Sequence, residues 1–185
     1  MNLLIEKAPD YIVIRGEKIN INTSFEKWVD FLIAAKKNDI SRVQCALLKI
    51  LCTIPKCNIS EIITECVRWS FNTGSDKQSI ETSESKNTSV PFDFDVDGNV
   101  IYCELWEYFP HLMERGISYH EGVELIKILM HNENTMLWHR AFARTGDFSG
   151  MSKEQKKYWQ KQRAIWVIPD AAKQDDIDNI MSGAF

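Results

Sequence analysis

Three amphipathic stripes follow one another between residues 25 and 67, and they constrain the fold more than any other feature. In each stripe, apolar residues recur every three or four positions, which places them on one side of an α-helix. The stripes consist of Phe25, Trp28, Val29 and Leu32; of Val43, Ala46, Leu47, Ile50 and Leu51; and of Ile59, Ile62, Ile63, Cys66 and Val67. Such short helices are marginal in water alone, so we expect them to pack on one another or on a partner.

A short β-hairpin is predicted before the first stripe. Residues 11–21 alternate apolar and polar side chains around a turn that contains Gly16. The period then changes to that of a helix, where Thr23 and Glu26 have the spacing of a capping box. We expect Trp28 to belong to the core and this helix to cover one face of the hairpin.

Further helices are predicted in the second half of the chain. The first carries Ile101, Leu105, Tyr108 and Phe109 on one face. The next helix begins with a capping box at Ser118 and Glu121, and a third runs near 135–144. The last helix begins with a capping box at Ser152 and Gln155 and runs towards Pro169.

The composition changes between the two helical regions. Residues 73–91 contain Ile80 and Val90 as their only aliphatic residues of size, so this stretch is predicted to be a flexible linker. We therefore predict a mainly α fold: a helical bundle with a short N-terminal β-hairpin, in two helical parts joined by the linker. The N-terminal part is 1–72 and the C-terminal part is 92–185.

Composition and motifs exclude several classes of function. The net charge of −4 gives no general attraction to nucleic acid or to a membrane surface. The first apolar run ends at Glu6, too short for a signal peptide, and no run reaches the length of a membrane span. No P-loop, G-x-S-x-G, G-x-G-x-x-G or H-E-x-x-H motif occurs. We expect a soluble cytoplasmic protein that is not an enzyme and binds no cofactor.

The five cysteines suggest neither disulfides nor zinc. Their number is odd, no C-x2-C pair occurs, and no histidine stands at a ligand spacing. We expect buried thiols, particularly at Cys45, Cys52 and Cys66.

The last predicted helix mixes basic and aromatic residues, a combination that also occurs in nucleic-acid-binding proteins. Placing its residues at 100° per position separates the two classes. Tyr158, Trp159, Ile165 and Trp166 fall on one face, and Lys153, Lys156, Lys157, Lys161 and Arg163 fall on the opposite face. Stacking on bases requires aromatic rings on the same face as the charges, so we expect no nucleic-acid binding.

Residues 93–104, DFDVDGNVIYCE, match the twelve-residue pattern of a calcium loop. The candidate ligands are Asp93, Asp95, Asp97 and Glu104. The context does not fit, because the predicted linker precedes the loop in place of a helix and Ile101 occupies a ligand position. Acidic residues ahead of a helix also cap its free N–H groups, so we interpret Asp95 or Asp97 as a cap and expect no metal.

Several segments together resemble a known family. They are the opening MNLLIEKAPD, then INTSFEKW, FDFDVDGNVIY, RTGDFS, and KKYW followed by the IP that ends at Pro169. In these segments the chain resembles the bacteriophage gene-product-fifteen family of tailed phages of Gram-positive bacteria. One departure is Tyr119 and His120, where the family usually has an aromatic pair. The glycine of the apparent calcium loop is commonly another small residue in that family, which favours capping.

The resemblance implies a tail-assembly chaperone. Such a protein binds the tape-measure protein during tail morphogenesis in the host cytoplasm and is absent from the mature virion. The tail tube protein is a further candidate partner, and a homo-oligomer and the residues that touch the partner stay open. The alternative is a structural tail or connector component, which would remain in the virion.

Overall fold

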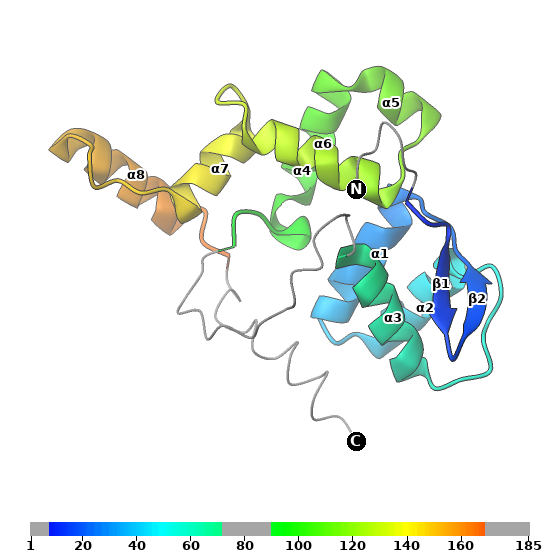
Figure 1. The fold of residues 1–185 in the computed structure, drawn as a ribbon. Coiled ribbons are helices and arrows are strands. Elements are labelled where there is room, and N and C mark those ends of the chain that lie inside the picture. The colour runs from blue at the N-terminus through cyan, green and yellow to red at the C-terminus, as the bar shows by residue number, and fades with distance from the viewer. Residues whose placement is uncertain (1–7, 72–89, 169–185) are drawn as a thin grey trace. The chain divides into compact units, whose positions relative to one another are not determined.

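The computed structural model describes residues 8–71 and 90–168. Within these residues the chain forms eight α-helices and one antiparallel β-hairpin (Figure 1). The prediction of a mainly α fold with an N-terminal hairpin is confirmed. The predicted flexible linker, 73–91, lies outside the described residues except for Val90 and Pro91.

The regular elements have the following bounds. The strands are β1 (Tyr11–Ile14) and β2 (Glu17–Asn20), and the helices are α1 (Phe25–Lys36), α2 (Ile40–Ile50), α3 (Ile59–Phe71), α4 (Phe94–Tyr108), α5 (Pro110–Arg115), α6 (Tyr119–Met130), α7 (Met136–Thr145) and α8 (Lys153–Ile165).

The described residues form two compact units. The first unit comprises the chain up to residue 71 together with His111–Glu124, and the second comprises 90–110 together with 125–168. The division predicted from the linker placed His111–Glu124 with the C-terminal part. The structure groups this segment with the N-terminal helices instead.

The β-hairpin has the predicted position and a two-residue turn. Ile14 pairs with Glu17, and Arg15 and Gly16 between them have φ of +51° and +83°. Positive φ at both positions is the requirement of the tight turn that matches the twist of the strands. The hairpin packs on α3 rather than mainly on α1 as predicted, and the ion pair of Arg15 with Glu61 joins its turn to α3.

Trp28 is fully buried, which confirms its assignment to the core of the first unit. Its ring stacks on Trp69 of α3 with centroids 4.1 Å apart and meets Phe31 edge-on at 5.9 Å. Tyr119 lies 5.9 Å away on a third side, and the indole Nε1 donates to the carbonyl oxygen of Asn22 at 2.7 Å. The core of this unit is therefore an aromatic cluster shared by three helices.

The start of α1 is fixed by backbone hydrogen bonds and not by a side-chain cap. The predicted capping box at Thr23 is wrong, since α1 begins with no side-chain cap. Instead, the N–H of Phe25 donates to the carbonyl of Ile117 at 3.0 Å, and the N–H of Tyr119 donates to that of Thr23 at 2.7 Å. These two bonds, together with the burial of Tyr119, are the reason that His111–Glu124 belongs to the first unit.

Two other predicted capping boxes are confirmed. The N–H of Ser118 donates to the Glu121 carboxylate at 2.8 Å, and the N–H of Glu121 donates to Ser118 Oγ at 3.3 Å. Ser152 and Gln155 exchange the same pair of bonds at the start of α8. Both helices therefore begin where the sequence pattern places them.

Of the three cysteines predicted to be buried, only Cys66 is buried. Cys66 is buried, and its burial raises the pKa of the thiol to about 12. Cys45 and Cys52 are exposed, because they lie on the outer sides of their segments.

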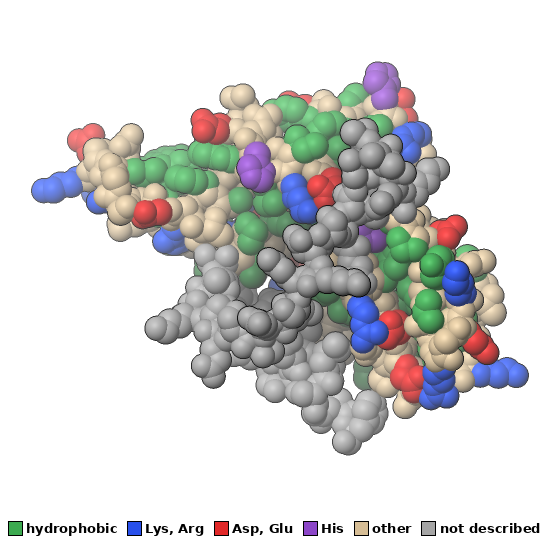
Figure 2. All heavy atoms as spheres, in the orientation of Figure 1, with side chains coloured by type: hydrophobic (Ala, Val, Ile, Leu, Met, Phe, Trp, Pro, Cys, Tyr) green, Lys and Arg blue, Asp and Glu red, His purple; other side chains and the backbone are tan. Residues whose placement is uncertain are grey.

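The predicted faces of α8 are partly wrong. Trp159 packs against α7, but Tyr158 and Ile165 are exposed. Conversely, the Arg163 guanidinium lies over the ring of Phe148, 4.3 Å from its centroid. Since α8 rests mainly on one helix, α7, only a narrow strip of its surface is covered. Figure 2 shows hydrophobic side chains gathered on the surface over these two helices.

Candidate functional site

The calcium-like motif is the first three turns of α4. Asp93 is the N-cap: its carboxylate accepts from the N–H groups of Asp95 at 2.9 Å and Val96 at 3.0 Å. The backbone N–H of Asp93 itself donates to the carboxylate of Asp97 at 2.9 Å. The interpretation of the motif as a helix cap is therefore supported, but the capping residue is Asp93 and not Asp95 or Asp97 as predicted.

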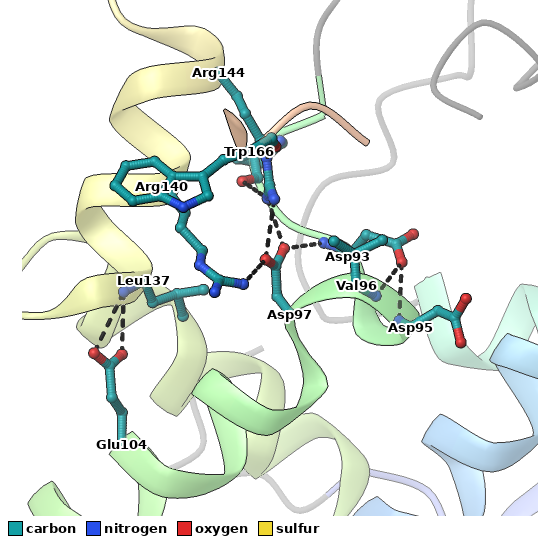
Figure 3. A network of polar contacts seen from close by, with 10 residues as sticks. Asp93, Asp95, Val96, Asp97, Glu104, Leu137, Arg140, Arg144 and Trp166 are labelled. Carbon is teal, nitrogen blue, oxygen red and sulfur yellow. Dashed lines mark hydrogen bonds and ion pairs between the residues drawn. The ribbon is translucent and has the colours of Figure 1, made fainter. Parts of the chain in front are cut away.

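Asp97 forms a buried ion-pair network with two arginines of α7 (Figure 3). Arg144 binds it with both terminal nitrogens, Nη1 at 2.6 Å and Nη2 at 3.0 Å. Arg140 Nη1 donates to Asp97 Oδ1 at 2.8 Å. Asp97 and Arg144 are both buried, so this bidentate pair joins α4 to α7 in a water-poor environment.

The electrostatics of Asp97 follow from this network. Burial alone pushes the pKa of this carboxyl upward, but the hydrogen bonds from Arg144 and Arg140 outweigh burial and leave the pKa below its ordinary value. Asp97 is therefore charged at neutral pH.

Arg144 also anchors the segments on either side of the network. Its Nε donates to the carbonyl of Trp166 at 2.6 Å, and Nη1 donates to that of Pro91 at 3.1 Å. One guanidinium thus connects the residue after α8, the approach to α4, and Asp97.

Glu104 forms a second anchor, two to three turns further along α4. Its carboxylate accepts from the N–H groups of Met136 and Leu137, the first residues of α7 (Figure 3). The free N–H groups and positive end of a helix favour a carboxylate there. Burial nevertheless raises the pKa of Glu104, the backbone bonds offsetting only part of the effect.

The four acidic residues of the motif do not converge on one point. Asp93 and Asp97 meet at the helix start, while the Asp95 carboxylate points away from Asp97 (Figure 3). Glu104 lies eleven residues after Asp93, about 16 Å along a helix at 1.5 Å per residue. Within residues 8–71 and 90–168, no group of three metal-binding side chains is found. The carboxylates bind arginine and backbone N–H groups instead.

The opposite face of α4 carries exposed apolar side chains. Tyr102 is 55% exposed and Trp106, one turn later, is 37% exposed, with ring centroids 6.3 Å apart. Val96, nearer the N-terminus, is also exposed, but it lies on a neighbouring side of the helix, about 80° around the axis from Trp106. We call Tyr102 and Trp106 the α4 patch. Asp95 and Glu107 border it, and α4 contains no lysine or arginine.

Sequence reasoning identified the buried face of α4 but not the α4 patch. Ile101 and Leu105 are buried as expected, whereas Tyr108, predicted beside them, is exposed. Placing the full helix from Phe94 at 100° per residue sets Tyr102 and Trp106 outside the buried face. Tyr102 and Trp106 each directly follow a residue of the buried face, Ile101 and Leu105, and therefore lie about 100° further around the helix.

His120 is a second candidate, in the first unit. It is buried against Trp69, with ring centroids 4.3 Å apart, and its Nε2 lies 3.3 Å from the Trp69 carbonyl oxygen. Its Nδ1 has no hydrogen-bond partner in the described part of the chain. Burial lowers the pKa of His120, so the ring is neutral at neutral pH. Enclosed by aromatic rings, His120 is a packing residue of the core.

None of the helices in the described ranges is both long and apolar enough to cross a membrane. No protein-family model matches the chain, and searches of characterised proteins and of solved structures find no match either.

Proposed function

We propose that this protein is a tail-assembly chaperone of a tailed phage, and that the α4 patch binds an amphipathic helix of the tape-measure protein. The sequence supports the class of function through its resemblance to the gene-product-fifteen family. The observation that carries the binding site is the pair of exposed rings, Tyr102 and Trp106, on one helix face.

The α4 patch has the chemistry of a protein-binding surface. Tyrosine and tryptophan are enriched among the residues that dominate interface energies. The helix that carries them is fixed from behind by Asp97 and Glu104, each bonded to α7. A surface held in place before binding loses less conformational entropy when its partner docks.

The border of the patch indicates what kind of helix would fit. Asp95 and Glu107 favour a partner whose apolar stripe is flanked by lysine or arginine. A tape-measure protein is a long helical chain whose apolar stripes are uncovered until the tail tube encloses it. A chaperone can cover such a stripe by packing an apolar helix face of its own against it.

Co-expression with segments of the tape-measure protein encoded in the same genome tests the proposal. Tyr102→Ala with Trp106→Ala should reduce capture of the client by at least about thirty-fold, as expected when interface anchors are removed. Phe71→Ala is the matched control, because it removes an aromatic ring that is 75% exposed on another helix, α3. Equal capture by both variants would show that the α4 patch is not the binding site.

Mass spectrometry of purified virions separates the proposal from its alternative. A chaperone should be absent from finished particles. Recovery at a fixed stoichiometry with the tail proteins would instead establish a structural component.

A further inference from the structure

A second exposed apolar surface lies on α8, within the same unit. Tyr158 is 52% exposed and Ile165, two turns later on the same side, is 58% exposed. Lys157 and Lys161 lie beside them along the helix. We call these four residues the α8 patch.

The charges of the two patches are opposite. The α8 helix contains five basic residues and one acidic residue. The α4 patch is bordered by Asp95 and Glu107 and has no basic residue on its helix. Each surface therefore offers the charge and the apolar side chains that the other would select in a partner helix.

The two patches are not used against each other within one chain. Both α4 and α8 pack on α7, and each keeps its patch exposed. Because every copy of the protein carries both surfaces in equal number, a second copy is the partner that can satisfy both of them.

We propose that α8 of one copy docks on α4 of a second copy, the α8 patch covering the α4 patch. Lys157 and Lys161, about 6 Å apart along α8, then extend outward to Asp95 and Glu107, about 18 Å apart along α4. The apolar parts are compatible in length, since Tyr102 to Trp106 spans about 6 Å of helix and Tyr158 to Ile165 about 10 Å.

The size of the surfaces predicts a weak and salt-sensitive association. Each exposed aromatic ring offers on the order of 100 Å² to a partner, so one helix pair stays well below the roughly 800 Å² per partner of a stable interface. Two such contacts made reciprocally would bury twice as much, which is still the size of a weak and transient interface. We expect a dissociation constant in the micromolar range that rises with salt, because exposed charges are screened.

This inference does not depend on the proposed client. It also implies that self-association and client binding compete for the α4 patch, so free protein would be stored with its binding surface covered. Self-association is measured on the protein alone, so its failure would leave the proposed function untouched. Failure of client capture would likewise leave self-association untouched.

Charge reversal across the contact provides the test, by sedimentation equilibrium over a range of concentrations. One variant carries Asp95→Lys and Glu107→Lys, and the other carries Lys157→Glu and Lys161→Glu. Each variant alone brings like charges together and should weaken association at least ten-fold. An equimolar mixture of the two restores opposite charges at the contact and should associate within a few-fold of wild type.

The matched controls make the same charge changes at exposed sites elsewhere. They are Glu17→Lys with Glu133→Lys, and Lys37→Glu with Lys127→Glu. These should associate like wild type. Recovery in the mixture excludes misfolding as the cause of the loss, since a misfolded chain would not regain association. A monomeric wild type at millimolar concentration, or a mixture no better than its components, would overturn the proposal.

Discussion

Replacing Asp97 by asparagine should destabilise the second unit more than any other single charge change on α4. The substitution keeps the shape of the side chain but removes the negative charge that faces Arg144 and Arg140. The new carboxamide would also direct an amide donor towards a guanidinium donor in either of its two orientations, because both Asp97 oxygens accept from Arg144. The buried Arg144 would then lack a counter-ion.

The magnitude follows from the burial of the pair. Asp97 accepts four hydrogen bonds, from Arg144 twice, Arg140 once and the Asp93 backbone once. Breaking a buried ion pair by removing one charge typically costs about 3–5 kcal/mol. Domains of this size are stable by only about 5–15 kcal/mol, so the loss is a large share of the total.

Urea unfolding combined with hydrogen exchange measures this effect. A loss of about 3–5 kcal/mol should lower the urea midpoint by roughly 1–3 M. Since tryptophans occur in both units, fluorescence alone cannot assign the change. Peptides from α4 and α7 should exchange faster in the Asp97→Asn variant, while peptides from α1 should not.

Asp95→Asn is the matched control for this prediction. It removes the same charge from the same helix turn, but at an exposed position outside the network of Asp97 with the two arginines. A second readout is acid sensitivity. Because the folded pKa of Asp97 is lowered, its contribution is complete above the ordinary value of 3.8 and is lost as pH falls through the folded pKa. Asp97→Asn should lack this component.

Equal midpoints for Asp97→Asn and Asp95→Asn would refute the reasoning. The network would then contribute no net stability, and the apolar contacts of α4 alone would fix its orientation on α7.

Four further outcomes are expected. Trp28→Ala should cost about 3–5 kcal/mol in the free energy of unfolding, measured in urea, because it empties the centre of the aromatic core; an unchanged midpoint would contradict this. Gly122→Ala should lower the thermal midpoint by several degrees, since a Cβ there would overlap the ring of Phe25; a stabilised variant would show that the ring can move away. The folded pKa of His120 lies below its unfolded value of 6.5, so the contribution of His120 to wild-type stability should be complete above pH 6.5. Below that pH the free energy of unfolding should fall by at most about 1.4 kcal/mol per pH unit, and His120→Gln should reduce this slope. Equal slopes in the two proteins would remove His120 as the cause. Calorimetry with millimolar calcium should show no saturable heat, because the motif carboxylates bind arginines and backbone N–H groups; a heat that disappears in Asp93→Ala would establish a calcium site.

The sequence by itself determined the local structure. Helical periodicity located most of the helices, and the capping boxes at Ser118 and Ser152 marked two helix starts correctly. The hairpin followed from alternation and from Gly16 at its turn. These features depend on neighbouring residues only, so a single sequence contains the information that specifies them.

Only the tertiary structure decided which faces are buried and which segments belong together. Arg144 lies 47 positions from Asp97, and Trp69 lies 41 positions from Trp28, so no local pattern connects either pair. The start of α1 is bonded by a distant backbone segment, which made its apparent capping box misleading. A helix pattern shows that one side is apolar, but the number of neighbours that cover it decides how wide the buried strip becomes. That is why Tyr158 is exposed beside the packed Trp159.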